Sequence, residues 1–455
     1  MKVLLCSQIH GPKGLAFASG ICFPIGLAYI ASMLKDHDVT IFDSNVEEKP
    51  LEKLSKLLNN EEPEVVGISL RNIDLLNPPD IVPDYYVHFK SMINLVKEEA
   101  PSSKIAVGGT GFSLFSKEIM EENLAIDYGI VSNAETTIYN LLRNMDHPER
   151  VRNLTLRASN RIVFTGKEEA TDFDNLPAPS REQFDMRSYR NKPFSMGIQS
   201  KRGCTFRCSY CPDPFLGNYC LQKRSPKKVV DEIESLANDY NVYSFFFVDS
   251  IFNYPLEHAR EICNEIKRRN LDVQWQAYFR EDFLNQRFMR EASNAGCSLF
   301  EFHSDGSCDK VLTMLKKNIK IKDIERTIDL IHTVDNAKVG YNFFYDLPEN
   351  NPENLFALTR LTAKILSTCR DRLAYLALTR MRIFPHTSLY KIALRQGKIN
   401  KNTNLLNSVY YKSNSSKVQE KYISILDKLS YNLTKNTKDM SSQPQKMPQS
   451  FPIKS

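Results

Sequence analysis

Three cysteines lie within one short segment of the chain, and their types and spacing suit metal chemistry. Cys204, Cys208 and Cys211 follow a C-x3-C-x2-C pattern, with Tyr210 directly before the last cysteine. Cysteine thiolates are the usual protein ligands of iron–sulfur clusters, and a [4Fe–4S] cube takes four of them. Three thiolates leave the fourth iron open, so the segment predicts a cluster that can bind a small molecule at one corner.

Other interpretations of these cysteines stay open at this point. A structural zinc site needs four ligands, commonly as two separated pairs. Here only Cys208 and Cys211 form a C-x2-C pair, with Cys220 available as a further ligand. A zinc- or cluster-bearing module that binds nucleic acid without catalysis is therefore the alternative from another functional class.

Composition narrows the class of protein. The chain has 455 residues with 42% hydrophobic and 25% charged side chains, which is typical of a soluble protein of about two domains. No segment approaches the roughly 20 apolar residues that cross a bilayer. The ten cysteines are scattered and no secretory segment opens the sequence, so we expect a reducing, cytoplasmic location.

The net charge of +6 comes from the end of the chain. Residues 401–455 contain nine Lys, no Arg and three acidic residues, and the other 400 residues carry 51 basic and 51 acidic side chains. A nucleic-acid enzyme more often carries a basic stripe on its folded body. The charge pattern therefore predicts no nucleic-acid partner.

Short apolar runs alternate with helical runs over residues 1–145, which predicts a doubly wound, Rossmann-like parallel sheet. Ligands of such sheets bind beyond the carboxyl ends of the strands. The expected strands are Lys2–Ser7, Val39–Phe42, Val65–Ser69, Ile105–Gly108 and Tyr128–Val131, and the expected helices are Pro24–Lys35, Leu51–Leu58, Tyr85–Glu99, Phe115–Asn123 and Thr136–Asn144.

A second alternating series over residues 194–400 predicts six βα units. Six units are too few for a closed eight-stranded barrel, so we expect a partial (β/α)6 barrel. The cysteine segment follows the first strand of this series, where βα barrels carry their catalytic groups. The expected strands are Phe194–Gln199, Ser244–Val248, Val273–Ala277, Leu299–Phe302, Val339–Phe344 and Leu373–Arg382.

Two segments show little periodicity. Residues 146–193 are expected to be a connector between the two units, with an extended strap around Pro177 and Pro179. Residues 401–455 are expected to be a polar, basic tail with one amphipathic helix over 418–433 and disorder over 434–455.

The cysteine segment resembles the signature of the radical S-adenosylmethionine (radical SAM) enzymes. The resemblance implies Cys204, Cys208 and Cys211 as cluster ligands, and Tyr210 near the adenine of S-adenosylmethionine. Asp249 and Ser250 end the second barrel strand, where the family contacts the amino group, and a carboxylate suits an ammonium partner. The resemblance implies Asp305 as the residue that meets the ribose hydroxyls.

Two further residues are candidates for a catalytic role. His303 stands where the family usually has glycine, so it can position substrate or move a proton, with a packed histidine as the alternative. Arg280 ends the third barrel strand and can pair with a carboxylate, with a surface ion pair as the alternative.

The first unit is similar to the cobalamin-binding subfamily of radical SAM enzymes. Phe23–Tyr29, Ser69–Asp74 and Val107–Ser113 carry this similarity. It implies cobalamin contacts from Ser69, Leu70, Arg71, Asn72, Gly108, Gly109, Thr110, Gly111 and Glu135. The D-x-H-x-x-G motif that supplies a histidine to cobalt elsewhere is absent, and His10 is the nearest histidine to its place.

The resemblance as a whole implies an enzyme with three cofactors: a [4Fe–4S] cluster, S-adenosylmethionine and cobalamin. It would generate a 5′-deoxyadenosyl radical and methylate an unactivated carbon of a natural-product, peptide or lipid-type substrate. A radical cyclisation or rearrangement with the same cofactors is the alternative. The expected partners are the substrate and a low-potential electron donor such as flavodoxin or ferredoxin.

Overall fold

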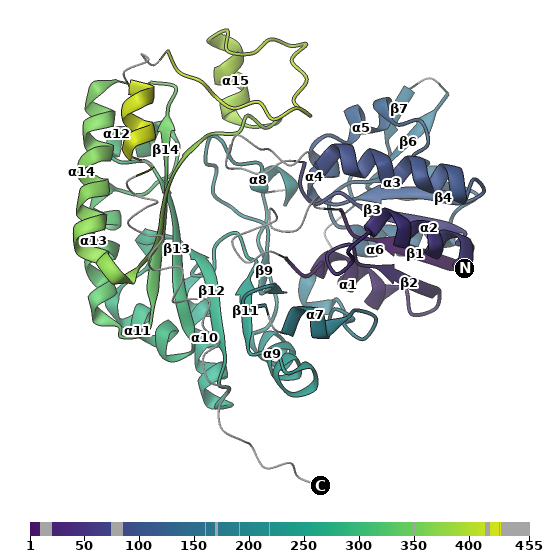
Figure 1. Cartoon of the computed structure of the whole chain (residues 1–455), viewed down its shortest axis with the longest axis horizontal. Helices are drawn as coiled ribbons and strands as arrows, with labels where there is room; N and C mark the ends of the chain where they lie inside the picture. Colours follow the sequence, from purple (N-terminus) through teal and green to yellow (C-terminus); the bar gives the residue numbers. More distant parts are fainter. Residues whose placement is uncertain are drawn as a thin grey trace.

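The chain forms two α/β units that lie side by side (Figure 1). The computed structural model describes residues 1–9, 21–73, 85–159, 161–168, 172–190, 192–217, 219–349, 351–414, 419–426 and 428. His10 and Asp74, named above from the sequence, lie outside these residues, as do residues 434–455. Of the amphipathic helix expected over 418–433, residues 419–426 are described and helical.

The amino-terminal unit is a seven-stranded sheet with the order β2-β1-β3-β4-β5-β6-β7. Its first five strands are parallel, which confirms the predicted Rossmann-like arrangement. They are β1 (Lys2–Cys6), β2 (Asp38–Phe42), β3 (Val65–Ser69), β4 (Lys104–Gly108) and β5 (Tyr128–Ile130). The helices are α1 (Ile25–Met33), α2 (Pro50–Glu61), α3 (Tyr85–Glu99), α4 (Thr110–Leu114), α5 (Ser116–Glu122) and α6 (Ala134–Arg143).

Strand β1 shows why this sheet is covered on both faces. Val3 and Leu5 pack into one buried cluster, and Leu4 and Cys6 pack into another. Successive side chains of a strand point to opposite faces, so an unbroken apolar run needs helices on both sides.

The expected connector is more ordered than its sequence suggests. Strands β6 (Leu154–Ala158) and β7 (Arg161–Phe164) form a hairpin that extends the sheet antiparallel to β5. Val163 and Phe164 are exposed, so these strands lack the continuous apolar pattern by which the buried strands were recognised. Short helical segments follow at Phe173–Asn175 and at α7 (Met186–Arg190).

The second unit is a six-stranded parallel sheet with the order β15-β14-β13-β12-β11-β8. This confirms the predicted partial barrel. The strands are β8 (Met196–Ile198), β11 (Ser244–Phe247), β12 (Gln274–Phe279), β13 (Cys297–Asp305), β14 (Lys338–Asp346) and β15 (Leu373–Arg380). The helices are α9 (Pro226–Tyr240), α10 (Leu256–Arg268), α11 (Gln286–Asn294), α12 (Asp309–Met314), α13 (Ile321–Leu330), α14 (Pro352–Cys369) and α15 (Ser388–Arg395).

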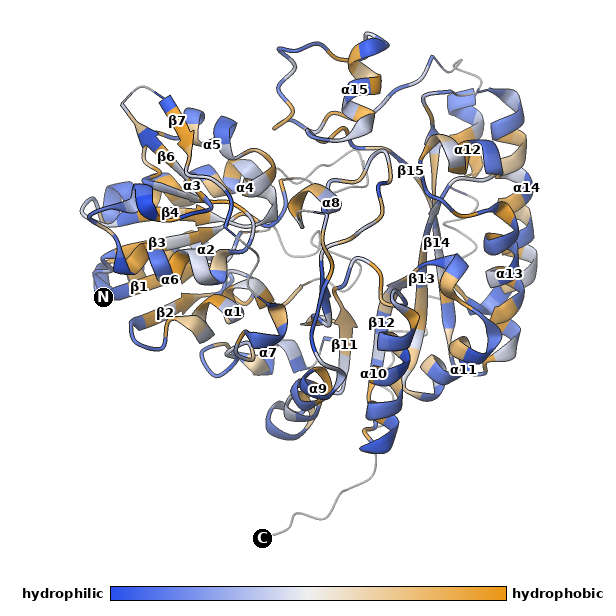
Figure 2. Ribbon diagram, turned by 180° about the vertical axis from the view of Figure 1, so that it is seen from behind, coloured by the Kyte–Doolittle hydropathy of each residue, from blue (hydrophilic) through white to orange (hydrophobic). Residues whose placement is uncertain are grey.

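The two faces of the barrel strands differ in character. On β12, Trp275, Ala277 and Phe279 are fully or almost fully buried, whereas Gln276 and Tyr278 between them are partly accessible. Figure 2 shows hydrophobic strands inside and hydrophilic outer surfaces on the surrounding helices. The buried set therefore packs against the helices, and the accessible set lines the inside of the barrel.

Part of the expected tail is folded. The Arg382 guanidinium donates to the carbonyl oxygens of Leu405 and Val409, and Tyr411 is 1% exposed. Leu406 packs into the core of the amino-terminal unit, so this segment joins the two units. Isolated apolar residues in a polar run carry no periodicity, so the sequence pattern did not predict this folded segment.

Among the described helices, none combines the length and the apolar character needed to cross a membrane.

Candidate active site

The cysteine loop begins at the carboxyl end of the first barrel strand and returns as a narrow hairpin. Strand β9 (Lys201–Arg202) pairs antiparallel with β10 (Gln222–Lys223), and the helical turn α8 (Asp213–Leu216) lies between them. Gly203 has a φ of +86°, and a Cβ there would lie 2.1 Å from the carbonyl oxygen of Cys220. Only glycine allows this closure.

Backbone contacts hold the middle of the loop in place. The Ser209 amide donates to the Leu315 carbonyl at 2.8 Å, and the Leu389 amide donates to the Ser209 carbonyl at 2.7 Å. The loop is thus anchored between the segment that follows α12 and the start of α15.

The three thiols influence one another, which fits a shared ligand set. Burial raises the pKa of Cys204 to about 11, and the nearby Asp213 and Cys208 act in the same direction. Burial also raises the pKa of Cys208, against which Lys317 and Arg280 act. Two cations beside a thiol favour its thiolate form, and the thiolate is the form that binds iron.

The number of thiols in the loop suits an iron–sulfur cluster. Cys204, Cys208 and Cys211 would supply three of the four ligands of a [4Fe–4S] cube, and the fourth iron would keep an open position. A structural zinc site would need a fourth protein ligand.

Asp305 joins the cysteine loop to the end of β13. It adopts a φ of +64° beside a break in the β13–β14 register, and it is 1% exposed. Tyr210 donates to its carboxylate, and Lys317 Nζ lies 2.5 Å from the same oxygen, Oδ2. Lys317 also donates to the His303 carbonyl. The predicted residues Tyr210 and Asp305 therefore lie together, and their partner is Lys317, to which the sequence assigned no role.

Asp249 already has hydrogen-bond and ion-pair partners in the residues that follow strand β8. Its Oδ1 accepts from the backbone amides of Ser200 and Lys201 at 2.8 and 2.9 Å, and Lys201 Nζ lies 3.3 Å from Oδ2. The predicted ammonium contact would have to add to these. The geometry gives Asp249 a clear role in fixing the backbone that leads into the cysteine loop.

Ser250 points instead to a carboxylate that the sequence analysis missed. Its hydroxyl donates to Asp213 Oδ2 at 2.9 Å, and burial raises the pKa of Asp213. Asp213 also raises the pKa values of Cys204 and Cys211, so it lies beside the predicted cluster. Asp213 stands two residues after Cys211, and this short spacing was the signal in the sequence that could have identified it.

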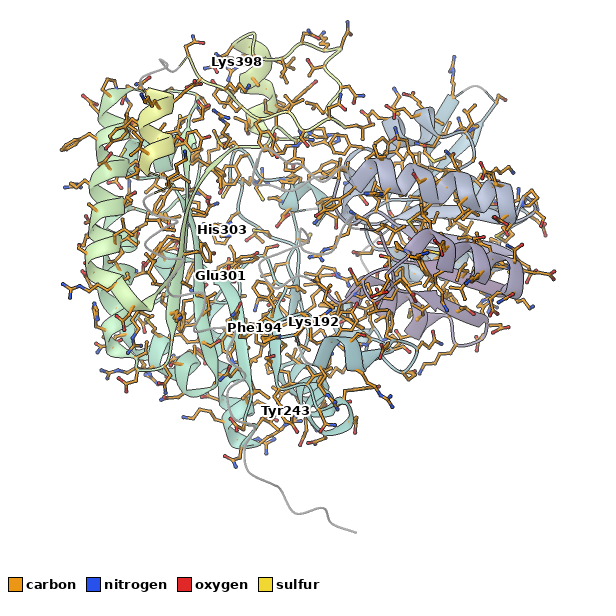
Figure 3. The ribbon with its side chains drawn as sticks, in the orientation of Figure 1. Lys192, Phe194, Tyr243, Glu301, His303 and Lys398 are labelled. Atoms are coloured by element: carbon orange, nitrogen blue, oxygen red, sulfur yellow. The ribbon has the colours of Figure 1, made fainter. Side chains whose placement is uncertain are left out.

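The two catalytic candidates lie in different surroundings. The Arg280 guanidinium stacks on the Phe206 ring at 3.8 Å and lies 2.8 Å from Asp282, so it supports the cysteine loop. The His303 ring packs edge-on against Tyr278 at 4.8 Å, and burial lowers its pKa. Figure 3 places His303 and Glu301 near the centre of the molecule, between the outer barrel helices and the amino-terminal unit.

The glycines of the predicted cobalamin segment serve the chain itself. Gly109 has a φ of +101°, and a Cβ there would lie 2.6 Å from the Leu70 carbonyl oxygen. The same oxygen accepts from the Gly111 amide at 2.9 Å. The turns after β3 and β4 therefore touch directly. The glycines are needed for this contact within the chain, whether or not a ligand approaches them. The structure places Ser69, Asn72, Gly108 and Thr110 at the same strand edge.

Arg71 and Glu135 face the barrel. The Cys22 thiol, followed by Tyr278 and Tyr85, raises the pKa of Arg71, so the guanidinium reaches toward strand β12. Glu135 Oε1 lies 2.8 Å from Arg202 Nη2. The ligand edge of the amino-terminal sheet therefore lies opposite the mouth of the barrel.

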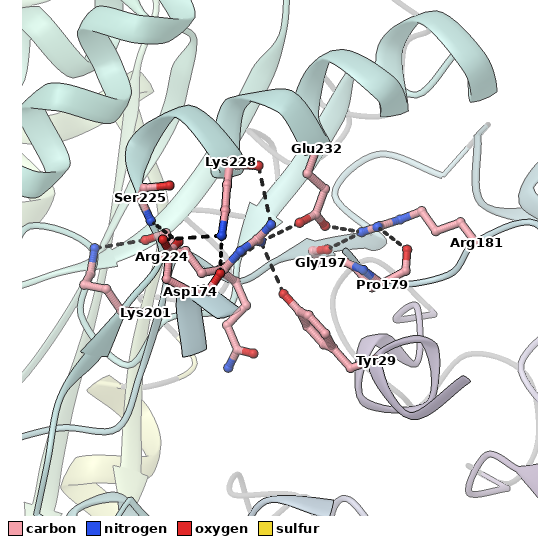
Figure 4. A network of polar contacts seen from close by, with 12 residues as sticks. Tyr29, Asp174, Pro179, Arg181, Gly197, Lys201, Arg224, Ser225, Lys228 and Glu232 are labelled. Carbon is pink, nitrogen blue, oxygen red and sulfur yellow. Dashed lines mark hydrogen bonds and ion pairs between the residues drawn. The ribbon is translucent and has the colours of Figure 1, made fainter. Parts of the chain in front are cut away.

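A buried ion network supports this arrangement (Figure 4). Glu232 on α9 lies between Arg181 and Arg224, at 2.6 Å and 2.5 Å. Arg224 also donates to the Tyr29 hydroxyl on α1 at 3.2 Å. Because a buried charge without a partner is costly, the three side chains fix the connector, the barrel and the amino-terminal unit against one another.

Two family models match the two units separately. The B12 binding domain model matches residues 14–142, and the Radical SAM superfamily model matches residues 198–359. The predicted cofactors, a [4Fe–4S] cluster, S-adenosylmethionine and cobalamin, follow from this pair of domains. The nucleic-acid module gains no support from either match.

Known proteins of similar sequence match most of this chain. An uncharacterized methyltransferase of Pyrococcus horikoshii is 22% identical over 82% of this chain and 78% of its own length. The anaerobic magnesium-protoporphyrin IX monomethyl ester cyclase of Cereibacter sphaeroides is 24% identical over 71% of this chain and 53% of its own.

A solved structure shows the same fold. The radical S-adenosylmethionine methyltransferase TsrM from Kitasatospora setae, solved with cobalamin and a [4Fe–4S] cluster bound, matches with a TM-score of 0.73 at 20% identity. The match covers 87% of this chain and 75% of TsrM. With a region that matches the B12 binding domain and a region that matches the Radical SAM superfamily, the chain has the domain composition of the cobalamin-binding radical SAM enzymes.

Proposed function

We propose that the protein methylates an unactivated carbon of a small-molecule or peptide substrate. The observation that carries the proposal is the pairing of a B12 binding domain with a radical SAM barrel whose strand ends face each other. When bound, the three cofactors supply the radical chemistry and the methyl group, and the protein supplies binding and orientation.

The proposed role of each residue follows from where it lies in the site. Cys204, Cys208 and Cys211 would hold the cluster, with Lys317 and Arg280 favouring the thiolate form of Cys208. Tyr210 and Asp305 form a buried polar pair beside the loop, which suits the adenosine part of S-adenosylmethionine. A low-potential electron donor such as flavodoxin or ferredoxin would complete the system.

The turns after β3 and β4 would hold cobalamin against the barrel mouth. Arg71 is the charged residue of this edge that reaches toward Tyr278, so it suits a position at the cobalamin face next to the substrate. The hydroxyl of Ser132 donates to the Leu216 carbonyl at 3.2 Å, which holds this edge close to α8 and the cysteine loop.

Product analysis tests the proposal. Protein reconstituted without oxygen with iron, sulfide and hydroxocobalamin is reduced and incubated with S-adenosylmethionine. Formation of both 5′-deoxyadenosine and S-adenosylhomocysteine is the expected result, because radical generation and methyl transfer leave different products. Absence of both would contradict the proposal.

A radical cyclisation is the second candidate, because the magnesium-protoporphyrin cyclase is among the similar sequences. It predicts 5′-deoxyadenosine without S-adenosylhomocysteine. The same assay therefore separates the two candidates.

A further inference from the structure

A single row of residues crosses the inner face of the barrel on four neighbouring strands. Tyr278 on β12, Glu301 on β13, Gly340 on β14 and Tyr375 on β15 are register partners in turn. Residues at one level of a parallel sheet point to the same face. The row therefore lies inside the barrel, away from the covering helices.

The strand neighbours of Glu301 support this orientation. Phe300 and Phe302 are fully buried in the core between strands and helices, whereas Glu301 is partly accessible. Because side chains alternate along a strand, the carboxylate of Glu301 points to the inner side.

Gly340 makes the contact across the row possible. A Cβ on Gly340 would lie 2.3 Å from the Tyr375 ring, so the ring lies directly over this position of β14. The Tyr375 hydroxyl thereby reaches past one strand and donates to Glu301 Oε2 at 2.7 Å. Glycine inside a strand commonly marks such a close approach.

The side chains around Glu301 are mostly aromatic, and the Arg71 guanidinium acts on the neighbouring Tyr278. Tyr278 packs against Phe246 and His303, at 5.0 and 4.8 Å between ring centres. Among the described residues, Tyr375 donates the hydrogen bond to the Glu301 carboxylate. Burial raises the pKa of Glu301 to about 7, against which the Tyr375 hydrogen bond acts.

A carboxylate in such a place favours a positively charged ligand. A charge taken out of water needs a partner of opposite sign, and charge-assisted hydrogen bonds are the strong ones. Tyrosine faces add an attraction for an ammonium group. A negatively charged ligand group would instead meet repulsion here.

We propose that Glu301, with the rings of Tyr278 and Tyr375, binds an ammonium group of the substrate, so that the substrate is an amine. The inference rests on the proposed function, because it takes the inner barrel as the place of the methyl acceptor. Asp305 lies four residues further along β13, which is roughly 13 Å at about 3.3 Å per residue. The reacting carbon therefore lies several bonds from the nitrogen, toward the cysteine loop.

Three probes of one shape and different charge test the proposal. Holoenzyme is titrated by calorimetry with 2-phenylethylamine, 2-phenylethanol and 3-phenylpropionate at pH 8. The amine is expected to bind at least tenfold more tightly than the carboxylate. Glu301→Gln is expected to weaken amine binding at least tenfold and to leave alcohol binding within twofold. Tyr375→Phe is expected to weaken amine binding about two- to fivefold.

Glu353→Gln is the matched control, because Glu353 is an exposed carboxylate on the outer helix α14. It is expected to bind all three probes like the wild type. Retained cluster absorbance and retained cobalamin show that each variant is folded. Equal binding of the three probes, no binding of any, or an unchanged amine preference in Glu301→Gln would overturn the proposal. These titrations need no turnover, so their failure is separate from a failure of the product assay.

Discussion

The two ligand edges of the molecule are built in opposite ways. At the edge of the amino-terminal sheet, glycines and backbone groups bring the turns together, as in the contact of Gly109 and Gly111 with Leu70. At the barrel edge, buried ion pairs and hydrogen bonds hold the segments together, as in the contact of Lys317 with Asp305.

The difference fits the cofactors that we propose for the two edges. The glycines let the turns after β3 and β4 pack together, and these turns would support the bulky cobalamin mainly through backbone groups. A cluster and a charged cosubstrate need oriented charges in a dry site. A substitution at one edge should therefore leave the cofactor of the other edge bound.

The largest effect is expected from removing the cluster ligands. In Cys204→Ala/Cys208→Ala/Cys211→Ala, 5′-deoxyadenosine formation should fall by about 1,000-fold or more, because the cofactor carries the chemistry. Cobalamin absorbance should remain, since the other edge is untouched. Iron analysis and the visible spectrum measure both. An iron cube that survives the triple substitution would contradict the ligand assignment.

Breaking the ion pair at the barrel edge should rank second. Asp305→Asn leaves Lys317 as a buried cation without its partner, and breaking a buried pair costs about 3–5 kcal/mol. The free energy of unfolding should fall by that order, and S-adenosylmethionine binding should weaken. Adding Lys317→Met should restore part of the stability. If the losses of unfolding free energy in the two single variants simply add up in the double variant, Asp305 and Lys317 do not stabilise the fold as a pair.

A substitution at the edge of the amino-terminal sheet should have the opposite effect on the two cofactors. Gly109→Ala forces a Cβ to 2.6 Å from the Leu70 carbonyl oxygen at a φ of +101°, and we expect a loss of about 2–4 kcal/mol. Cobalamin retention should fall while the cluster spectrum stays.

Gly26→Ala serves as the matched stability control for that variant. A Cβ on Gly26 meets no atom within 4 Å, and Gly26 lies in helix α1, where alanine is favoured by up to about 1 kcal/mol. Denaturation curves of the two variants measure the contrast. Equal stabilities would show that the turns do not touch as described.

The smallest effect concerns pH. Burial raises the pKa of Glu301 to about 7, so its carboxylate is present above pH 7 and is lost as the pH falls. Binding of 2-phenylethylamine should therefore weaken about tenfold between pH 8 and pH 6, and Glu301→Gln should remove this dependence. Tyr278 and Tyr375 stay neutral over this range because their pKa values are raised. A dependence that persists in Glu301→Gln would assign it to another group.

The local pattern of apolar and polar residues was sufficient to predict much of the fold. Alternation of apolar strands and helical runs predicted the parallel strands of both units, including the bounds of Val65–Ser69 and Tyr85–Glu99. It missed the hairpin of β6 and β7, because strands with an exposed face lack a continuous apolar run. It also missed the folded segment around Tyr411, which is held by tertiary contacts.

The sequence by itself determined the chemistry of the cysteine loop, because three thiols at fixed short spacing must lie together whatever the fold. The tertiary structure decided which charges surround them. Lys317 and Arg280 come from distant segments, and the row from Tyr278 through Glu301 to Tyr375 exists only when four strands align in register. Register is a property of the whole sheet, so no local spacing could reveal these partners.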